Sequence, residues 1–418
     1  MAAEITGHIA MHLIAHGAKT VPEKENRLLM PKVHCDRPPT ASKVSSRADF
    51  MSRRVLIIAP RFSMYPCFTK MIAEGFSSIG CAVNICHVPD ATVFAHDVVL
   101  LTGLSQYDGG LTRWLSRRPE KKPVTVLWQL EPLPPVQLSV FGERIGFRVA
   151  KCDWGRLPPG LAKVLGNMMP FRTQTLRLIR RWLVRPYAQY VARQPEQEGW
   201  IQFDTEIFFK AMVEWVRIRA LHRAGCIDQF FATVQPRVEF LRSRGISADL
   251  LPFGYHPDWG GDLAIERDID VLFLGALVKR RGVLVHQLQQ QLERRGRKLT
   301  AVRRAFGEAR TELLNRTRIM LVLLRTPHDM PAMRLLLGMA CGALVVCEKC
   351  AGTSEFRSGE HFVMAELEQL PEVIHYYLTH EDERCRIARQ GHEFVTRELT
   401  IENMLCRLLD QIKMEAHL

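Results

Sequence analysis

The sequence predicts an α/β protein with two parallel, doubly wound sheets, one in each half of the chain. Short apolar runs alternate with helical stretches from Met51 onward, and the alternation resumes after a basic interruption. Strands that are separated by helices are typical of parallel sheets with helices on both faces. No internal repeat of fixed period and no low-complexity tract occurs in the sequence, which argues against a solenoid.

The first half predicts one sheet that carries an insertion. A Pro-rich break, Glu131-Pro-Leu-Pro-Pro135, precedes a strongly basic stretch at 141–190, which we interpret as the insertion. We expect strands at 55–59, 82–87, 97–101, 124–128, 229–233 and 248–251. The helices are expected at 68–79, 207–224 and 237–244. Gly80 marks the end of the first of these helices.

The second half predicts a second wound domain after a hinge. Pro252-Phe-Gly-Tyr-His-Pro-Asp258 is interpreted as the interdomain hinge. The expected strands are 270–276, 319–324 and 343–347, and the expected helices are 282–295, 367–378, 382–397 and 401–412. The domain assignment is a disordered leader or mis-assigned start at 1–50, an N-terminal domain at 51–251, a C-terminal domain at 252–395 and a C-terminal helix at 396–418.

The composition indicates a cytoplasmic protein with anionic partners. Lys plus Arg (57) exceed Asp plus Glu (44), and the net charge of +13 favours nucleotides, phospholipid surfaces or nucleic acid. The 11 cysteines are odd in number and no secretory leader is recognisable, so we expect thiols in a reducing compartment. No apolar run approaches the roughly 18 residues that a membrane-spanning helix needs.

Familiar nucleotide and metal motifs narrow the class of protein. The sequence contains neither Gly-x-x-x-x-Gly-Lys-Ser/Thr nor Gly-x-Gly-x-x-Gly, which excludes P-loop NTPases and standard dinucleotide dehydrogenases. Cys347-Glu-Lys-Cys350 has the spacing of a redox motif or half a zinc site. Two ligands do not make a tetrahedral site, so two unlinked thiols are the favoured interpretation. We expect no bound metal.

Two stretches near the C-terminus carry the pattern of a known family. His328-Asp-Met-Pro-Ala-Met-Arg-Leu-Leu-Leu-Gly-Met-Ala-Cys-Gly-Ala343 is followed by Thr353-Ser-Glu-Phe-Arg-Ser-Gly359. They resemble the spore-maturation (CgeB-like) GT-B glycosyltransferases, whose pattern is an Arg-x-Phe-Glu-x-x-Ala-x-Gly helix, a strand and a loop with Glu, Phe and Gly. Further matches are Asp270 to Gly275, Tyr376-Tyr377 and Arg386 to Gly391. The resemblance is good over roughly 269–409 and weaker over 51–104.

This resemblance implies a fold and an activity. The fold is GT-B, in which two Rossmann-like, doubly wound domains face a cleft. The activity is that of a bacterial-type glycosyltransferase, which moves a sugar from a nucleotide-sugar donor to a hydroxyl acceptor, for instance on a surface polysaccharide or glycoconjugate. The nucleotide-sugar is a co-substrate, and no cofactor is implied.

The donor diphosphate is expected on the C-terminal domain. A loop at the carboxyl end of a strand, followed by a helix N-terminus, presents N–H groups and a positive dipole end to phosphate. Gly275 and the basic residues after it form such a place, and Arg334 lies one helical turn after Pro331, where it can pair with phosphate. With the positions that the resemblance adds, the candidate donor-binding residues are Gly275, Lys279, Arg281, Asp329, Arg334 and Glu355.

One position departs from related GT-B enzymes. In those enzymes a Glu-x7-Glu pair brackets this region and its second Glu binds the ribose of the donor, whereas here the two positions are Asp329 and Leu337. A leucine cannot accept a hydrogen bond from a hydroxyl, and losing such a partner costs roughly 1 to 3 kcal/mol of binding. A second interpretation therefore stays open, a non-catalytic GT-B-like binding or assembly protein.

Two residues are candidates for catalytic groups. Glu131 follows an apolar run and would suit a general base for an acceptor hydroxyl if it lies at the carboxyl end of a strand. Its alternative, which we favour, is a solvated loop carboxylate. His256 lies in the expected hinge and could contact donor or acceptor, although a structural histidine beside Pro257 is the more common case.

A basic amphipathic segment at 171–184 lies within the insertion. It places Leu178, Ile179, Trp182 and Leu183 on one side at helical spacing, with three arginines largely elsewhere. This pattern suits either peripheral contact with an anionic membrane at the inner face or an ordinary surface helix that packs on its own domain. Nucleic acid is disfavoured because no recognised binding module accompanies the arginines.

Overall fold

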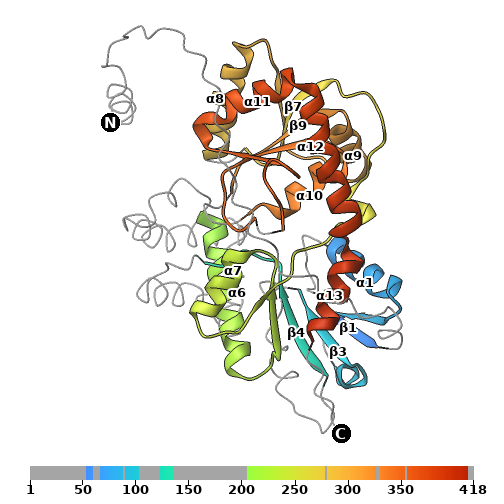
Figure 1. Ribbon diagram of the computed structural model, residues 1–418. Helices are drawn as coiled ribbons and strands as arrows, with labels where there is room; N and C mark the ends of the chain where they lie inside the picture. The colour runs from blue at the N-terminus through green and yellow to red at the C-terminus, as the bar shows by residue number, and fades with distance from the viewer. Residues whose placement is uncertain are drawn as a thin grey trace, which may run out of the picture. The chain divides into compact units, whose positions relative to one another are not determined.

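The computed structural model describes residues 53–59, 66–87, 90–102, 123–134, 205–277, 280–325, 330–353 and 355–412. It contains a six-stranded sheet in the order β2-β1-β3-β4-β5-β6 and a five-stranded sheet in the order β11-β10-β9-β7-β8 (Figure 1). All strand pairs in the two sheets are parallel. The two parallel, doubly wound sheets predicted from the sequence are confirmed.

The first sheet follows the predicted alternation. Its strands are β1 (Arg54–Ile58), β2 (Ala82–Cys86), β3 (Val98–Leu101), β4 (Val124–Gln129), β5 (Gln229–Ala232) and β6 (Asp249–Leu250). The helices are α1 (Pro66–Ser78), the 3-10 turn η2 (Ala91–Ala95), α6 (Thr205–Arg223) and α7 (Gln235–Ser243). Gly80, two residues after α1, has a φ of 93°, which only glycine adopts easily, so the chain turns there as predicted.

The second sheet is built in the same way. Its strands are β7 (Ile269–Leu274), β8 (Leu299–Val302), β9 (Thr317–Val322), β10 (Leu344–Glu348) and β11 (Val363–Ala365). The helices are α8 (Arg280–Glu293), α9 (Gly307–Asn315), α10 (Ala332–Ala340), α11 (Leu370–Thr379), α12 (Glu381–Glu393) and α13 (Ile401–Gln411). Short turns are η6 (Pro257–Trp259), η7 (Leu367–Gln369) and the π-helical η8 (Phe394–Glu398).

Some of these elements were not predicted. β8 and β11 lie at the two edges of the second sheet, and three of the four residues of β8 are only partly buried. β11 has only three residues and β8 has four, so each sequence gives a weak signal. The helix expected at 382–397 ends as an α-helix at Glu393 and continues as a π-helical turn.

The interior strands form the core because parallel sheets are covered on both faces. All four residues of β3 are 0% exposed. Such strands appear in the sequence as continuous apolar runs rather than alternating patterns, which is why the sequence located them well.

The last helix, α13, packs against the first helix, α1. A Cβ atom on Gly75 of α1 would lie 2.8 Å from Cδ1 of Leu405, on α13, and 3.2 Å from Cγ2 of Ile401. In Figure 1, α13 (red) lies beside α1 (blue). Tyr255, in the expected hinge, accepts a hydrogen bond from the N–H of Ile401 and donates its own N–H to the carbonyl of Leu399, both at 2.7 Å. The start of α13 is therefore tied to the linker and its apolar face to α1.

Three predicted segments lie outside the described residues: the leader at 1–50, the insertion at 141–190, and the amphipathic segment at 171–184 within it. Their predictions stay untested. Among the helices that the structure describes, none is both long and apolar enough to cross a membrane.

Candidate functional site

The carboxyl end of β7 brings a glycine and an arginine together. Gly275 follows the strand, and its N–H donates to the carbonyl of Val302 at the end of β8 (2.9 Å). Arg334, in the first turn of α10, donates from Nη1 to the carbonyl of Leu274 (2.7 Å). An ideal Cβ on Gly275 would lie only 2.6 Å from Nη2 and 2.7 Å from Nη1 of Arg334. The missing side chain of Gly275 therefore makes room for the guanidinium.

A buried ion pair lies at the same edge of the sheet. Glu348 ends β10 and is bound by both terminal nitrogens of Arg280, the first residue of α8; one of these contacts, from Nη1 to Oε2, measures 2.9 Å. The side chains of Arg280 and Glu348 are 13% and 8% exposed. Arg281, the next residue of α8, donates from Nε to the carbonyl of Leu324 just after β9 (3.3 Å). Three strand ends and the start of α8 thus converge around this cluster.

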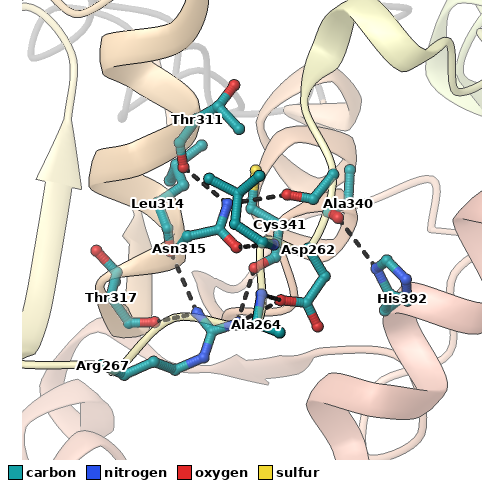
Figure 2. Close-up of polar contacts among 12 residues, drawn as sticks. Asp262, Ala264, Arg267, Thr311, Leu314, Asn315, Thr317, Ala340, Cys341 and His392 are labelled. Carbon is teal, nitrogen blue, oxygen red and sulfur yellow. Dashed lines mark hydrogen bonds and ion pairs between the residues drawn. The ribbon is translucent and has the colours of Figure 1, made fainter.

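The position of Arg334 depends on how α10 is held at its other end. Figure 2 shows Arg267 and His392 approaching the C-terminus of α10. Arg267 donates from Nη2 to the carbonyl of Cys341 (2.9 Å), and Nδ1 of His392 lies 3.0 Å from the carbonyl of Ala340. Donors at a helix C-terminus satisfy carbonyls that have no partner within the helix, and a cation there also suits the helix dipole. The helix is thereby fixed at the end opposite Arg334.

Arg267 also holds α9 and the linker before β7. Its Nη1 donates to the carbonyls of Leu314, near the end of α9, and of Thr317, at the start of β9, at 3.3 and 2.8 Å. Asn315 accepts the N–H of Leu263 in the linker at 2.7 Å. The guanidinium of Arg267 therefore joins the C-terminal ends of α9 and α10.

The other residues predicted to bind the nucleotide-sugar donor lie in different surroundings or outside the described residues. Lys279 and Asp329 lie outside the described residues. Glu355 pairs with Arg407 of α13, with 3.3 Å between Oε1 and Nη2. Leu337 is partly buried and packs against the main apolar core. The structure therefore brings Gly275, Arg281 and Arg334 to one edge, whereas Glu355 is engaged by the C-terminal helix.

His256 lies in a separate polar cluster with α1. Its Nδ1 accepts the N–H of Asp258 (3.2 Å), so its ring proton is on Nε2, which is 3.2 Å from Oε2 of Glu74. Lys70 completes the cluster, with Nζ 2.8 Å from Oδ2 of Asp258 and 3.6 Å from Oε1 of Glu74. The hydrogen bond with Lys70 lowers the pKa of Asp258, and the same contact raises the pKa of Lys70.

This cluster has a composition that resembles a metal site, but its polar groups already contact one another. Glu74, His256 and Asp258 offer ligand atoms within 4.8 Å of one another. The ammonium group of Lys70 contacts both carboxylates, and both ring nitrogens of His256 have partners. The arrangement ties the 252–258 loop to α1.

Glu131 lies two residues after β4, at the carboxyl edge of the first sheet, and is partly exposed. Its carbonyl accepts a hydrogen bond from Nε2 of the buried Gln129 (2.9 Å). The neighbouring carbonyl of Leu130 accepts Nη1 of Arg237 (2.6 Å), which also contacts Thr233 Oγ1 (2.9 Å). The backbone around Glu131 is therefore held rigidly by a buried amide and a buried arginine.

Cys347 and Cys350 remain thiols at the end of β10. Cys347 is 0% exposed. A hydrogen bond with Cys350, together with burial, raises the pKa of the Cys347 thiol well above its ordinary value. A protonated, buried thiol is a poor nucleophile.

The sequence interpretation did not single out the Arg280–Glu348 pair. Glu348 directly follows the apolar run of β10, and a charged side chain at the carboxyl end of a buried strand is the same signal that pointed to Glu131. The arrangement offers cationic groups and a glycine-lined backbone at the edge where parallel sheets bind ligands. It is suited to an anion such as a diphosphate.

Part of the chain matches a known family. Residues 270–410 match the model of a family described as glycosyl transferase-like. The matched residues contain the second sheet and the cluster around Gly275, Arg334 and Glu348. No curated protein matches the chain.

Several solved structures share a distant likeness. S. aureus TarM is 10% identical with a TM-score of 0.40, and the match covers 47% of this chain and 45% of TarM, less than half of each. HepE from Anabaena, in complex with UDP-glucose, is 9% identical with a TM-score of 0.45, covering 85% of this chain and 99% of HepE. Sucrose-phosphate synthase from Thermosynechococcus elongatus is 10% identical with a TM-score of 0.48, covering 86% and 98%.

Proposed function

We propose that the protein is a glycosyltransferase that binds a nucleotide-sugar at the carboxyl edge of its second sheet. The observation that supports this most is the juxtaposition of Gly275 and Arg334, because a glycine that admits a guanidinium at a strand end makes a compact anion site. The glycosyl transferase-like match over 270–410 covers the same residues.

In the proposed reaction an acceptor hydroxyl attacks the anomeric carbon of the donor sugar. A bond forms between the acceptor oxygen and this carbon, the bond to the diphosphate oxygen breaks, and the acceptor proton passes to a base. Arg334 and Arg281, with Lys279, stabilise the charge that grows on the leaving diphosphate. We assign the base role to Glu131, in place of the solvated loop carboxylate that the sequence favoured, because its backbone is held at the carboxyl edge of the first sheet. The chain supplies these groups without a metal in this scheme.

The acceptor class and the cellular setting extend the proposal. We infer a hydroxyl of a surface polysaccharide or glycoconjugate as acceptor, met by a cytoplasmic protein at the inner membrane face. The support is the basic amphipathic pattern of 171–184 and the net charge of +13.

A second candidate function is a non-catalytic binding or assembly protein. Its support is Leu337, which packs its side chain against the core at the position where related GT-B enzymes place the ribose-binding Glu. Such a protein would retain the fold and bind a nucleotide-sugar weakly or not at all.

The test is direct binding of nucleotides. Thermal shift and calorimetry with UDP, GDP, ADP, CMP and dTDP and their sugars need no acceptor, because a ligand of the native state raises the unfolding temperature. We expect one base to bind, Arg334→Ala to weaken that binding at least tenfold, and Arg316→Ala, at the opposite edge of the sheet, to leave it unchanged. Slow hydrolysis of the matching nucleotide-sugar would then separate the enzyme from the binding protein. Folded wild-type protein that binds none of the panel would overturn the donor site.

A further inference from the structure

The carboxylate of Glu348 accepts hydrogen bonds from two different parts of the chain. Its Oε2 accepts Nη1 of Arg280 at 2.9 Å and the N–H of Leu324 at 3.0 Å, while its Oε1 accepts Nη2 of Arg280. The side chain of Glu348 is 8% exposed. Bidentate contact with an arginine fork fixes the plane of the guanidinium as well as its position. The start of α8 and the segment after β9 are thus locked to the end of β10.

The backbone of Leu324 connects Glu348 to Arg281. Leu324 donates its N–H to Glu348 and, through its carbonyl, accepts Nε of Arg281 at 3.3 Å. Arg281 is 4% exposed, so its side chain has little freedom to reorient unless that carbonyl moves. Two consecutive arginines of α8 are therefore held by one carboxylate, one directly and one through the backbone.

We propose that Glu348 is a positioning residue for the donor site, which fixes the start of α8 through Arg280 and so holds Arg281 in the orientation that receives a diphosphate. The inference rests on the proposed donor site and adds a residue outside its set of binding groups. A carboxylate at an anion site lowers the local positive potential, so its direct electrostatic effect opposes diphosphate binding. Any favourable effect of Glu348 on diphosphate binding therefore has to come from the way it orients the arginine side chain.

Because the electrostatic and geometric effects of Glu348 on diphosphate affinity have opposite signs, the direction of the change in affinity tests the inference. If Glu348 only reduces the positive potential, Glu348→Gln removes a negative charge and tightens diphosphate binding. If Glu348 only stabilises the fold, Glu348→Gln lowers the unfolding temperature and leaves the affinity of the folded protein unchanged. If Glu348 positions the arginines, Glu348→Gln weakens binding although a negative charge has been removed.

The experiment measures nucleoside diphosphate affinity by calorimetry and the unfolding temperature without nucleotide, on the full chain. The ligand is whichever of UDP, GDP, ADP, CDP and dTDP the wild type binds. The variants are Glu348→Gln and the double variant Arg280→Met/Glu348→Gln, which removes both charges and so avoids an unpaired buried guanidinium. The control is Asp268→Asn, which breaks the two-contact pair with Arg316 at the amino edge of the same sheet.

We expect both Glu348 variants to bind about tenfold more weakly than wild type, which corresponds to about 1.4 kcal/mol. Asp268→Asn is expected to change the unfolding temperature only. Equal or tighter binding by folded Glu348→Gln, or by the double variant if the single one does not fold, overturns the inference while the donor site stands. A wild type that binds no diphosphate refutes the donor site itself and this inference with it.

Discussion

The guanidinium of Arg334 occupies the space into which a side chain on Gly275 would project. Its nitrogens Nη1 and Nη2 lie 2.7 and 2.6 Å from the ideal Cβ position, closer than any normal contact. The φ of Gly275 is 150°, outside the range that residues with a side chain prefer. A side chain at this position would therefore displace the guanidinium, and the backbone conformation itself favours glycine.

Gly275→Ala is expected to displace Arg334 and to weaken nucleotide binding at least tenfold, since hydrogen bonds to charged groups contribute about 1.5 to 3 kcal/mol. Calorimetry with the best nucleotide of the panel measures this. Gly296→Ala is the matched control, because Gly296 also has a positive φ of 68° but no atom within 4 Å of its ideal Cβ. Equal losses of affinity in both variants would mean that backbone strain, and not the displaced arginine, is responsible.

Arg267 is expected to contribute most of its effect to stability. Arg267→Met removes donors from the carbonyls of Leu314, Thr317 and Cys341. With about 1 kcal/mol for each hydrogen bond, we expect a loss of about 3 kcal/mol in the free energy of unfolding, measured with urea. Arg316→Met removes an exposed pair with Asp268 and should cost much less stability, because solvent screens that pair. Similar losses in the two variants would contradict the role of Arg267 in joining the helix ends.

The sequence predicted the interior of the fold better than its edges and its polar contacts. Buried parallel strands such as β3 and β10 are continuous apolar runs, which stand out in the sequence. β8 is a partly exposed edge strand and gave no such run. The link from Arg267 to three carbonyls joins residues up to 74 positions apart, and no local pattern encodes it.

The candidate site shows the same division. Gly275 was predicted from a strand end followed by basic residues, and Arg334 from its place one helical turn after Pro331, which are local signals. Their mutual contact depends on how α10 packs on β9 and β10. The role of Glu348 follows only from the convergence of α8, β9 and β10. His256 was predicted as a candidate catalytic residue; the structure places it against Glu74 and Asp258, partners that lie on α1 and in η6.

The Lys70–Asp258 contact should make stability depend on pH at both extremes. The pKa of Asp258 is lowered below 3.8 by Lys70, so its stabilising contribution is present above about pH 4 and is lost as the pH falls through the lowered value. The pKa of Lys70 is raised above 10.5, chiefly by Asp258, so its contribution is complete below that pH and is lost as the pH rises through the raised value. Urea unfolding of wild type and Asp258→Asn should therefore differ near pH 7 and converge at both extremes. A difference that is the same at pH 2 and pH 7 would contradict this.

Leu337 decides between the two proposed functions. If the site is a working donor pocket with one missing contact, Leu337→Glu supplies an acceptor for a ribose hydroxyl and should tighten binding of the preferred nucleotide about tenfold, in the range of about 1 to 3 kcal/mol for such a hydrogen bond. Replacing a partly buried leucine also removes apolar contacts, so the free energy of unfolding should fall by about 1 kcal/mol or more. Leu337→Gln offers a similar shape and an uncharged acceptor, and Leu337→Met keeps the apolar contacts as the control. Tighter nucleotide binding by Leu337→Glu and Leu337→Gln, but not by Leu337→Met, supports an active donor site. Unchanged affinity in all three folded variants means that the ribose binds elsewhere, and Leu337 is then no argument for the non-catalytic function.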